Sequence, residues 1–194
     1  MSKKYEFVSG DEITIAPGRT VKRIRALVAI AALGVSPGDL GGYIESEKNL
    51  SQVSGDAWVY GNAWVYGNAR VSGNARVYGD ARVYGDAWVY GNARVYGDAW
   101  VSGDARVYGD AWVSGDGLIF WASKVGTENG TLTVYNSKDN TLQVTRGCFI
   151  GSVDEFLSAS EQKHDADTHL EYRLLIEVAH SRITRSREKL EQSK

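Results

Sequence analysis

The most regular feature of the chain is the recurrence of apolar and polar positions between Val53 and Trp112. Ten uninterrupted copies of one hexapeptide fill this segment, each reading Val, Tyr or Ser, Gly, Asn or Asp, Ala, Arg or Trp, and a degenerate eleventh copy follows at 113–118. A period of six does not match a helix of 3.6 residues per turn. In an extended segment, each Val and the Ala two positions before the next Val face the same side, because side chains alternate. The pattern therefore predicts short strands with Val and Ala inward.

The Gly-Asn or Gly-Asp pair in each copy predicts a corner. These residue types tolerate positive φ, so the chain can change direction once per hexad. Three corners close a triangular coil of three hexads, and the solenoid is then only ~17 Å tall at the spacing of stacked strands. An aliphatic residue followed four positions later by a small one resembles the signature of the hexapeptide-repeat left-handed β-helix family. The resemblance implies a left-handed parallel β-helix over residues 53–118.

The flanking segments are expected to close the open ends of this solenoid, which otherwise expose unpaired strand edges. Residues 1–52 are expected to form an N-terminal β cap, with strand-like runs at Tyr5–Val8, Glu12–Ile15 and Val21–Ile30. The glycine-rich turn Gly38–Gln52 resembles the segment that precedes hexapeptide repeats in phage and prophage proteins. That resemblance implies a phage or prophage architecture and no specific activity.

Residues 119–194 are expected to form a small C-terminal module. Thr131–Tyr135 and Thr141–Thr145 alternate apolar and polar residues around a polar turn, which predicts a β-hairpin. Two helices are expected after the hairpin. The predicted fold class is therefore mainly β: a left-handed parallel β-helix, or hexapeptide solenoid, with a β cap at the N-terminus and a small α+β module at the C-terminus.

The two helices have recognisable boundaries. Ser152 is placed to cap a short helix, and a longer helix is expected to begin near Asp165 or Asp167 and to end near Leu190. Four residues spaced alternately by four and three lie on one side of the longer helix and predict an oligomerisation seam. These residues are Tyr172, Ile176, Ala179 and Ile183.

Composition and charge exclude several classes of protein. The 194 residues include 22 Lys and Arg against 24 Asp and Glu, for a formal net charge of −2. This balance argues against sequence-independent binding of nucleic acid, which needs a basic excess, and against an acidic mimic of DNA. The single cysteine, Cys148, allows neither a disulfide framework nor a cysteine-built zinc site within one chain. Since no phosphate-binding loop or metal-ligand spacing is present, we expect no cofactor and no metal.

The distribution of apolar residues argues against a membrane protein. The first residues lack the apolar core of a signal peptide. The longest apolar stretch, Ala26–Val35, is about half the length that a membrane-spanning helix needs. We therefore expect a cytoplasmic protein, in the host cell if a phage encodes it.

The outward residues of the predicted strands carry the candidate chemistry. The sixth residue of each hexad is Trp or Arg, and the second residue adds seven tyrosines. With three hexads per coil, the sixth residues fall into three columns: Trp58, Arg76, Arg94 and Trp112; Trp64, Arg82 and Trp100; Arg70, Trp88 and Arg106. Arg and Trp are expected to stack in each column, at ~0.5 to 1 kcal/mol per exposed cation–π contact. These ten residues, with Tyr84 and Tyr90, are the candidates for binding a ligand or partner.

This aromatic surface predicts contact with another molecule. Five tryptophans and seven tyrosines on the outward positions each have on the order of 150 to 250 Å² of side-chain surface. Monomers rarely expose contiguous apolar patches above roughly 300 to 600 Å². We therefore expect a second subunit, a partner or a ligand to cover at least one face, with a homotrimer expected by resemblance and a dimer next. The alternative is a purely structural ladder in which Arg and Trp pack against like neighbours.

An enzyme is one alternative to a binding protein. The β-helix resemblance implies trimeric acyltransferases, and their general base is a histidine on or beside the coils. The three histidines, His164, His169 and His180, all fall in the C-terminal helical region, and no long loop interrupts a coil. The chain departs from the enzyme pattern at its catalytic residue, so we expect no enzyme. A divergent hexapeptide-repeat acyltransferase remains open.

The expected function is therefore binding without catalysis. Aromatic platforms stack flat rings, and neighbouring arginines bind phosphate. Together with the phage-type resemblance, this predicts a host-directed, counter-defence protein that sequesters a nucleotide-like ligand or occludes a host protein. A structural component of a virion or tail is the alternative. The sequence leaves open whether the working surface is a face of the prism, a subunit boundary or the C-terminal module near Trp121, Arg146 and Phe149.

Overall fold

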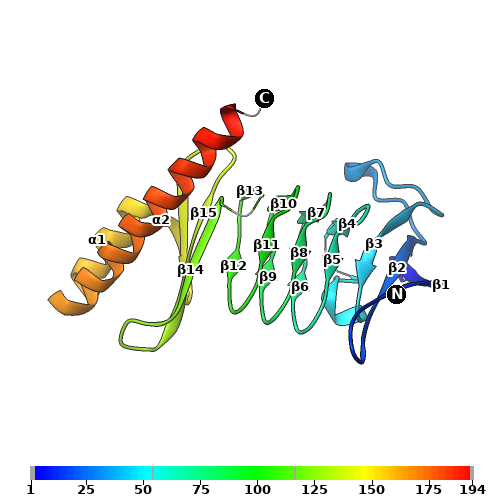
Figure 1. Ribbon diagram of the computed structural model, residues 1–194, viewed down its shortest axis with the longest axis horizontal. Helices are drawn as coiled ribbons and strands as arrows, with labels where there is room; N and C mark the ends of the chain where they lie inside the picture. The colour runs from blue at the N-terminus through cyan, green and yellow to red at the C-terminus, as the bar shows by residue number, and fades with distance from the viewer. Residues whose placement is uncertain (1–2, 54, 116, 193–194) are drawn as a thin grey trace.

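The chain forms three parts in succession along its long axis (Figure 1): an N-terminal antiparallel sheet, a parallel β-solenoid, and a C-terminal sheet with two helices. The computed structural model describes residues 3–53, 55–115 and 117–192. Residues 1, 2, 193 and 194, and positions 54 and 116 of the predicted repeat, lie outside the described residues. The mainly β fold with a parallel solenoid is confirmed.

In the part of the chain that the structure describes, the solenoid has ten short strands, one per hexad. They are β4 (Trp58–Val59), β5 (Trp64–Val65), β6 (Arg70–Val71), β7 (Arg76–Val77), β8 (Arg82–Val83), β9 (Trp88–Val89), β10 (Arg94–Tyr96), β11 (Trp100–Val101), β12 (Arg106–Val107) and β13 (Trp112–Ser114). Each pairs in parallel with a strand one coil away, as Trp58 pairs with Arg76. The coil of three hexads is therefore confirmed. Three stacks result, in the orders β4-β7-β10-β13, β5-β8-β11 and β6-β9-β12.

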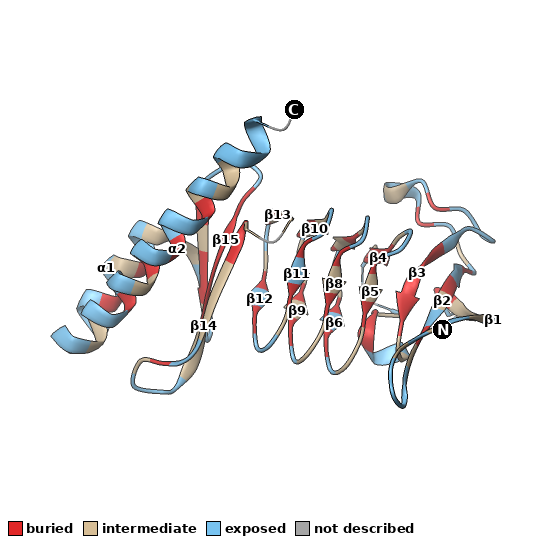
Figure 2. Cartoon of the chain, viewed as in Figure 1, coloured by how far each residue is buried: buried red, intermediate tan, exposed pale blue. Residues whose placement is uncertain are grey.

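The Val and Ala of the repeat fill the interior. From Ala57 to Val113, every one of these side chains is at most 1% exposed, and Figure 2 shows the buried positions recurring from coil to coil. Fully burying one valine contributes about 1.5 to 3 kcal/mol. Because the contacts run between successive coils, this core holds the stack together along its axis.

The corners stack as closely as the strands. Gly91 has φ +75°, and a Cβ added there would lie 2.8 Å from the backbone nitrogen of Gly109, one coil later. The Asn74 backbone N–H donates to the Gly91 carbonyl at 2.8 Å. Side-chain amides continue the ladder: Asn74 Nδ2 donates to Asn92 Oδ1 at 3.2 Å, and Asn92 Nδ2 donates to Asp110 Oδ1 at 3.0 Å. Both the positive φ and the close approach therefore require glycine at this corner.

The N-terminal sheet extends one side of the solenoid. Strands β1 (Tyr5–Ala16), β2 (Arg19–Ala26) and β3 (Leu40–Ile44) pair antiparallel in that order, and β3 pairs in parallel with β5. The strand expected over Val21–Ile30 thus ends at Ala26. Strand β3 lies in the segment predicted as a glycine-rich turn, because that segment pairs with the first coil. Short 3₁₀ helices at Ala31–Leu33 and Glu47–Asn49 belong to the same part.

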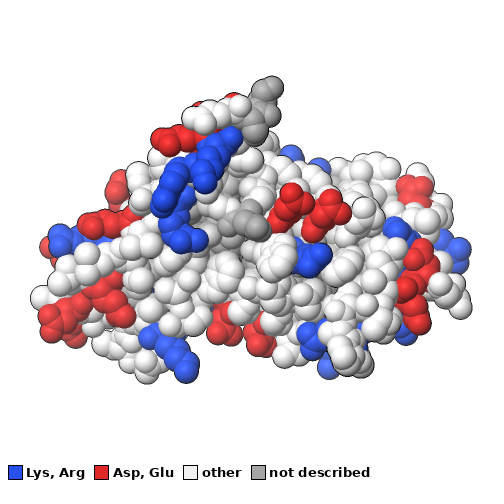
Figure 3. Space-filling model, viewed as in Figure 1, with Lys and Arg blue, Asp and Glu red and all other residues white. Residues whose placement is uncertain are grey.

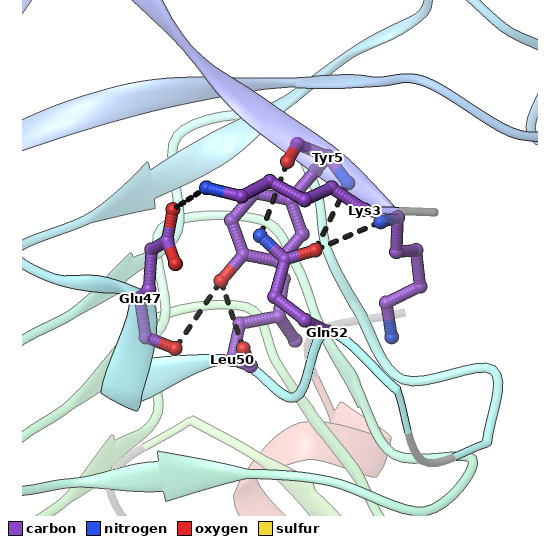
Figure 4. A network of polar contacts seen from close by, with 6 residues as sticks. Lys3, Tyr5, Glu47, Leu50 and Gln52 are labelled. Carbon is purple, nitrogen blue, oxygen red and sulfur yellow. Dashed lines mark hydrogen bonds and ion pairs between the residues drawn. The ribbon is translucent and has the colours of Figure 1, made fainter. Parts of the chain in front are cut away.

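A polar network fastens the N-terminal strand over the first coil (Figure 4). The Tyr5 hydroxyl donates to the Leu50 carbonyl at 2.8 Å. The Gln52 side chain accepts from the Lys4 backbone N–H at 2.8 Å and donates to the Tyr5 carbonyl at 3.1 Å. The Tyr5 ring packs edge-on against Trp58, with centroids 6.3 Å apart, and both side chains are fully buried. The strand therefore closes this end of the core.

The C-terminal sheet closes the opposite end. Its strands pair antiparallel in chain order: β14 (Ile119–Val125), β15 (Gly130–Asn136), β16 (Leu142–Arg146) and β17 (Phe149–Ser152). The Arg106 backbone N–H donates to Thr133 Oγ1 at 3.1 Å, and Thr145 Oγ1 donates to the Arg106 carbonyl at 2.8 Å. The predicted hairpin is confirmed as β15 and β16; the flanking strands β14 and β17 were not predicted.

Two helices lie side by side against the face of this sheet that points away from the solenoid (Figure 1). They are α1 (Val153–Lys163) and α2 (Ala166–Gln192). Ser152 caps α1, since the Glu155 backbone N–H donates to Ser152 Oγ at 3.3 Å and the Ser152 N–H donates to a Glu155 carboxylate oxygen at 2.8 Å. Both predicted helices are confirmed.

The position of α2 corrects the prediction of an oligomerisation seam. The four seam residues are at most 4% exposed and share one apolar cluster with side chains of β15 and β16. They are Tyr172, Ile176, Ala179 and Ile183. This stripe is the surface by which α2 covers its own sheet, so it is not exposed to a second subunit.

Replacing corner glycines should reveal how closely the coils stack. Gly91 and Gly109 both have positive φ, +75° and +58°, so alanine costs about 1 to 2 kcal/mol at either position. Only at Gly91 does the new methyl group meet backbone one coil away; at Gly109 no described atom lies within 4 Å. Gly91→Ala should therefore lower the free energy of unfolding in urea by more than Gly109→Ala. Equal losses would contradict the close stacking of the corners.

Stability should rise with pH over a window set by Lys4. Its Nζ donates to the Ala57 carbonyl at 2.9 Å. Burial lowers the pKa of Lys4 from 10.5 to about 8, and the Asp56 carboxylate acts in the opposite direction. Between these two values the unfolded chain keeps a proton that the folded chain has lost, so unfolding becomes less favourable as pH rises. Urea midpoints should therefore increase from pH ~7.5 to ~9.5. A Lys4→Met variant with the same increase would refute this assignment.

Candidate functional site

The outward residues form the three columns that the repeat predicts. The parallel register sets the sixth residue of each hexad beside the sixth residue of the hexad one coil later. We call the outward sides of the three stacks the β4 face, the β5 face and the β6 face, each after its first strand. The twelve candidate residues divide among these faces: Trp58, Arg76, Arg94 and Trp112 on the β4 face; Trp64, Arg82, Trp100 and Tyr84 on the β5 face; and Arg70, Trp88, Arg106 and Tyr90 on the β6 face.

On the β5 face, the arginine is held between two tryptophans. The Arg82 guanidinium carbon lies 4.6 Å from the ring centroid of Trp64 and 5.2 Å from that of Trp100. Tyr84 stacks on Tyr66 with centroids 5.0 Å apart. The charge of Arg82 thus has cation–π contacts on both sides within the chain, as expected for a purely structural ladder.

The β6 face has the reverse arrangement, a tryptophan between two arginines. The guanidinium carbons of Arg70 and Arg106 lie 5.4 and 5.1 Å from the Trp88 ring centroid. Ser72 replaces the tyrosine that most copies carry at this position. A hollow of about 410 Å³ is lined here by Ser72 and Tyr90 among other residues. Each arginine of this column already contacts an aromatic ring.

The β4 face differs because two arginines are direct neighbours. Arg76 and Arg94 are paired residues of strands β7 and β10. Of the two, Arg94 has a cation–π contact within the described residues, with its guanidinium carbon 4.9 Å from the Trp112 ring centroid. Within the described residues, neither guanidinium forms an ion pair with a carboxylate. Like charges directly opposite each other on neighbouring strands are destabilising, so this pair is poised to accept an anion.

A tyrosine ladder runs beside the two arginines. Tyr78 stacks on Tyr96 with centroids 4.9 Å apart, and Tyr60 meets Tyr78 edge-on at 6.4 Å. Tyr60, Arg76, Tyr78 and Arg94 line an open groove of about 320 Å³. Burial raises the pKa of Tyr60 and of Tyr78, while the nearby arginines act in the opposite direction. Both hydroxyls therefore stay protonated near neutral pH and can donate hydrogen bonds.

The two corner residues that directly precede these arginines are neutral, although the same ladder continues to Asp110 one coil later. The residue two positions before each is asparagine, Asn74 and Asn92, and their side chains bond to each other along the corner. By contrast, aspartate stands two positions before Arg82 and before Arg106. On the other side of the tyrosines, the corner carries Asp80 and Asp98. The positive charge of the groove is thus concentrated on its Arg76–Arg94 side.

Trp58 is corrected as a candidate binding residue. Its side chain is fully buried, and it belongs to the main apolar core. The repeat places Trp58 outward from the first coil, but β1 crosses this position and sets Tyr5 against the indole. Trp58 is therefore a contact of the N-terminal cap and not part of an open surface.

The repeat alone did not single out the tyrosines of the groove. The structure brings Arg76 and Arg94 together with Tyr60 and Tyr78, and it places Tyr84 and Tyr90 on the other two faces. A signal was present: among the sixth residues of the hexads, Arg76 and Arg94 are the one pair of arginines a single coil apart, and both follow Asn-Ala. The number of aromatic residues does not reveal this pair, because it does not compare residues that lie one coil apart.

In the C-terminal module, the sequence left open a working surface near Trp121, Arg146 and Phe149. These side chains mostly pack against other parts of the chain. Arg146 Nε donates to the Tyr172 hydroxyl at 3.0 Å, and its Nη2 donates to the Val125 carbonyl at 3.1 Å. Trp121 packs against the solenoid core, and Phe149 packs against the helical core. Arg146 is thus engaged within the chain, although a cavity of about 340 Å³ remains beside it and Phe149.

The histidines lie at the helices and not on the coils. The His164 ring is 5.6 Å from that of Tyr172, and His169 Nδ1 lies 3.3 Å from Ser160 Oγ. His180 is exposed on α2. Across the described ranges, no group of three His, Cys, Asp or Glu side chains is arranged to hold a metal ion. Neither helix, as far as the structure describes them, has the length and apolar character needed to cross a membrane.

Comparison with known families supports the architecture. Five overlapping stretches match the model of a family described as YdcK Beta solenoid repeat: residues 51–67, 63–77, 75–91, 87–103 and 99–115. Together they span residues 51–115, about a third of the chain. None of the curated proteins matches the chain. The chain is thus similar to a β-solenoid repeat family in its central part, in agreement with the parallel coils.

Two tryptophans at the same position of the repeat should respond differently to truncation. Trp58→Ala should lower the free energy of unfolding by about 3 to 5 kcal/mol, because it empties a buried site under Tyr5. Trp100 is 45% exposed, so Trp100→Ala should cost about 1 kcal/mol, mainly its contact with Arg82. Urea unfolding of both variants measures the difference. Similar losses would mean that Trp58 is not covered by β1.

Proposed function

We propose that the chain is a non-catalytic binding protein and that the groove of the β4 face holds a nucleotide-like ligand. The observation that carries the proposal is the pair Arg76 and Arg94, neighbours in register with no carboxylate partner among the described residues. In this arrangement the arginines bind the phosphate groups, and the tyrosine ladder contacts the base or sugar.

Phosphate relieves the repulsion within the arginine pair. Strands in register lie about 4.8 Å apart, so the two long side chains start from neighbouring positions and can converge on one phosphate or bind two linked phosphates. Each guanidinium offers planar, paired donors that match phosphate oxygens, and such charge-assisted bonds are about twice as strong as neutral ones. An anionic ligand therefore gains most at this face, where the charges are not separated by tryptophan.

The tyrosines supply a surface for a flat ring. Tyr60, Tyr78 and Tyr96 form a continuous aromatic column beside the arginines. Stacking of a base on an aromatic side chain is worth about 1 to 3 kcal/mol. A groove of about 320 Å³ is at the small end of ligand sites, which fits a mononucleotide or part of a larger nucleotide lying along the face.

The wider role follows from the resemblance of residues 38–52 and the repeat to phage and prophage proteins. On that basis we propose that the ligand is a nucleotide signal of the host, bound stoichiometrically so that its free concentration falls. A protein partner covering the same aromatic faces is the second form of this proposal. The virion component and the acyltransferase stay predictions from the sequence alone.

Native mass spectrometry with a mixture of cellular nucleotides tests the binding and identifies the ligand class. Arg76→Gln/Arg94→Gln should weaken binding of the captured nucleotide by about 100-fold or more, since each charged contact is worth about 1.5 to 3 kcal/mol. Calorimetry measures this loss. Raising salt should weaken binding in the native chain and much less in the double variant.

The matched control is Arg82→Gln/Arg106→Gln. It removes the same charge from the solenoid, but from arginines that contact Trp64, Trp100 or Trp88. This control should bind nearly as the native chain does. If both double variants lose affinity equally, general charge and not the β4 groove holds the ligand. If the native chain takes up no nucleotide, the proposed ligand class is wrong.

A further inference from the structure

A cavity in the C-terminal module lies where the two helices meet the turns of the sheet. It has a volume of about 340 Å³ and lies beside Arg146 and Phe149. Its walls come from α1, from the beginning of α2 and from the turns that join β14 to β15 and β16 to β17. Segments far apart in the sequence thus enclose one space, and its volume is that of a site for a small molecule.

Arg146 is the buried charge of this cavity. Its side chain is only 10% exposed. The bonds from Nε to the Tyr172 hydroxyl and from Nη2 to the Val125 carbonyl hold the guanidinium in one orientation. Within the described residues Nη1 donates no hydrogen bond, and its ion pair with Glu128 is long, at 3.9 Å. Because a buried charge is costly unless its hydrogen bonds are made, this arginine has donors left for another acceptor.

Arg146 differs in this respect from the basic residues on the outer surface. Figure 3 shows Lys and Arg gathered over the C-terminal half of α2, where Arg182, Arg185 and Lys189 are exposed. Water and salt screen such charges, so they attract an anion weakly. A guanidinium that is shielded from water and fixed in orientation forms stronger charge-assisted hydrogen bonds. The cavity, and not the helix surface, therefore has the properties of an anion site.

Aromatic rings form the apolar wall of the cavity. Phe149 meets Phe156 edge-on with ring centroids 5.2 Å apart, and Phe156 meets Tyr172 in the same way, also at 5.2 Å. The His164 ring follows, 5.6 Å from that of Tyr172. All four residues line the cavity. Such a wall favours a ligand with a flat, apolar body, because aromatic rings pack well edge-on or offset against one another.

We propose that this cavity binds a small molecule with one carboxylate and an aromatic ring. The carboxylate accepts hydrogen bonds from Arg146 Nη1, and the ring packs against Phe149 and Phe156. Lys163, an exposed residue that also lines the cavity, adds a second positive charge to its wall. The site is independent of the proposed ligand groove, because the helices lie on the face of the sheet that points away from the solenoid (Figure 1).

The charges around the cavity favour a carboxylate. The chain's own Glu128 carboxylate is the ion-pair partner of Nη1, but 3.9 Å is too long for a hydrogen bond, and this side chain is 74% exposed. Exposed ion pairs contribute little to stability, so a ligand carboxylate can replace Glu128 at little cost. With His164 counted as neutral, the charges of Arg146, Lys163 and Glu128 leave one positive charge on the cavity wall. One carboxylate balances this charge, whereas a phosphate dianion exceeds it.

Titration of the native chain with benzoate, phenylacetate and phenylpropionate, followed by NMR chemical shifts, tests the proposal. These probes differ in the distance between the ring and the carboxylate, and at least one should bind with one molecule per chain. Its neutral amide, and acetate without a ring, should each bind about tenfold more weakly or less, because one loses the charged hydrogen bond and the other the apolar contact. Failure of all three probes, or equal binding of acid and amide, would overturn the proposal.

Variants of exposed residues test the position of the carboxylate. Glu128→Gln should tighten binding of the probe by about threefold, because it removes the competing carboxylate, and Lys163→Gln should weaken it by about threefold. Lys138→Gln is the matched control: it removes the same charge from the exposed turn between β15 and β16, outside the cavity wall, and should leave the Kd near native. Misfolding cannot raise affinity, so a Glu128→Gln variant that binds no more tightly would overturn the assignment.

The single cysteine reports whether the probe occupies the cavity. Cys148 is exposed and lines it. A saturating concentration of the probe should slow alkylation of Cys148 by iodoacetamide several-fold, whereas the neutral amide at the same concentration should not. Arg76→Gln/Arg94→Gln should show the same protection as the native chain, because these arginines belong to the β4 face. Unchanged alkylation in the presence of bound probe would place the probe elsewhere and overturn the proposal.

Discussion

Stacking of each residue on the residue one coil away is the constraint on which the rest of the structure depends. Backbone hydrogen bonds cross from coil to coil, as from the Trp64 N–H to the Ala81 carbonyl at 2.9 Å. Inside, Val and Ala fill a core with no room for a change of period. Any residue that faces outward is therefore placed directly above a neighbour that follows three hexads later. The surface chemistry of the solenoid thus depends on which residues lie one coil apart.

This constraint gives apparently similar faces different properties. Where arginine and tryptophan alternate, as at Arg82, the charge is accommodated by rings on both sides. Where arginine follows arginine, as at Arg76 and Arg94, repulsion between like charges stays unrelieved within the chain. The same residue types thus produce a closed structural ladder on one face and, on another, the open groove that we propose as an anion site.

A short solenoid also needs closure at both ends, and the two ends use different means. Tyr5 and its network cover Trp58 at the first coil. At the last coil, a four-stranded sheet makes the cover, and α2 protects the far side of that sheet. Covering a sheet with a helix uses only one side of the helix. The outer side of α2, with Leu174 and Val178, is therefore left exposed within one chain.

The amino-acid sequence by itself determined the strands of the solenoid, the coil of three hexads, the three columns, the hairpin and both helices, because these depend on periodicity and local capping. Only the tertiary structure decided which outward residues stay open. Trp58 is buried because Tyr5 arrives from the start of the chain, and Tyr172 faces its own sheet and not a partner. Strand β3 forms where the sequence predicts a turn, because its partner is the first coil. Contacts between distant segments leave no local pattern, so they could not be predicted from the repeat.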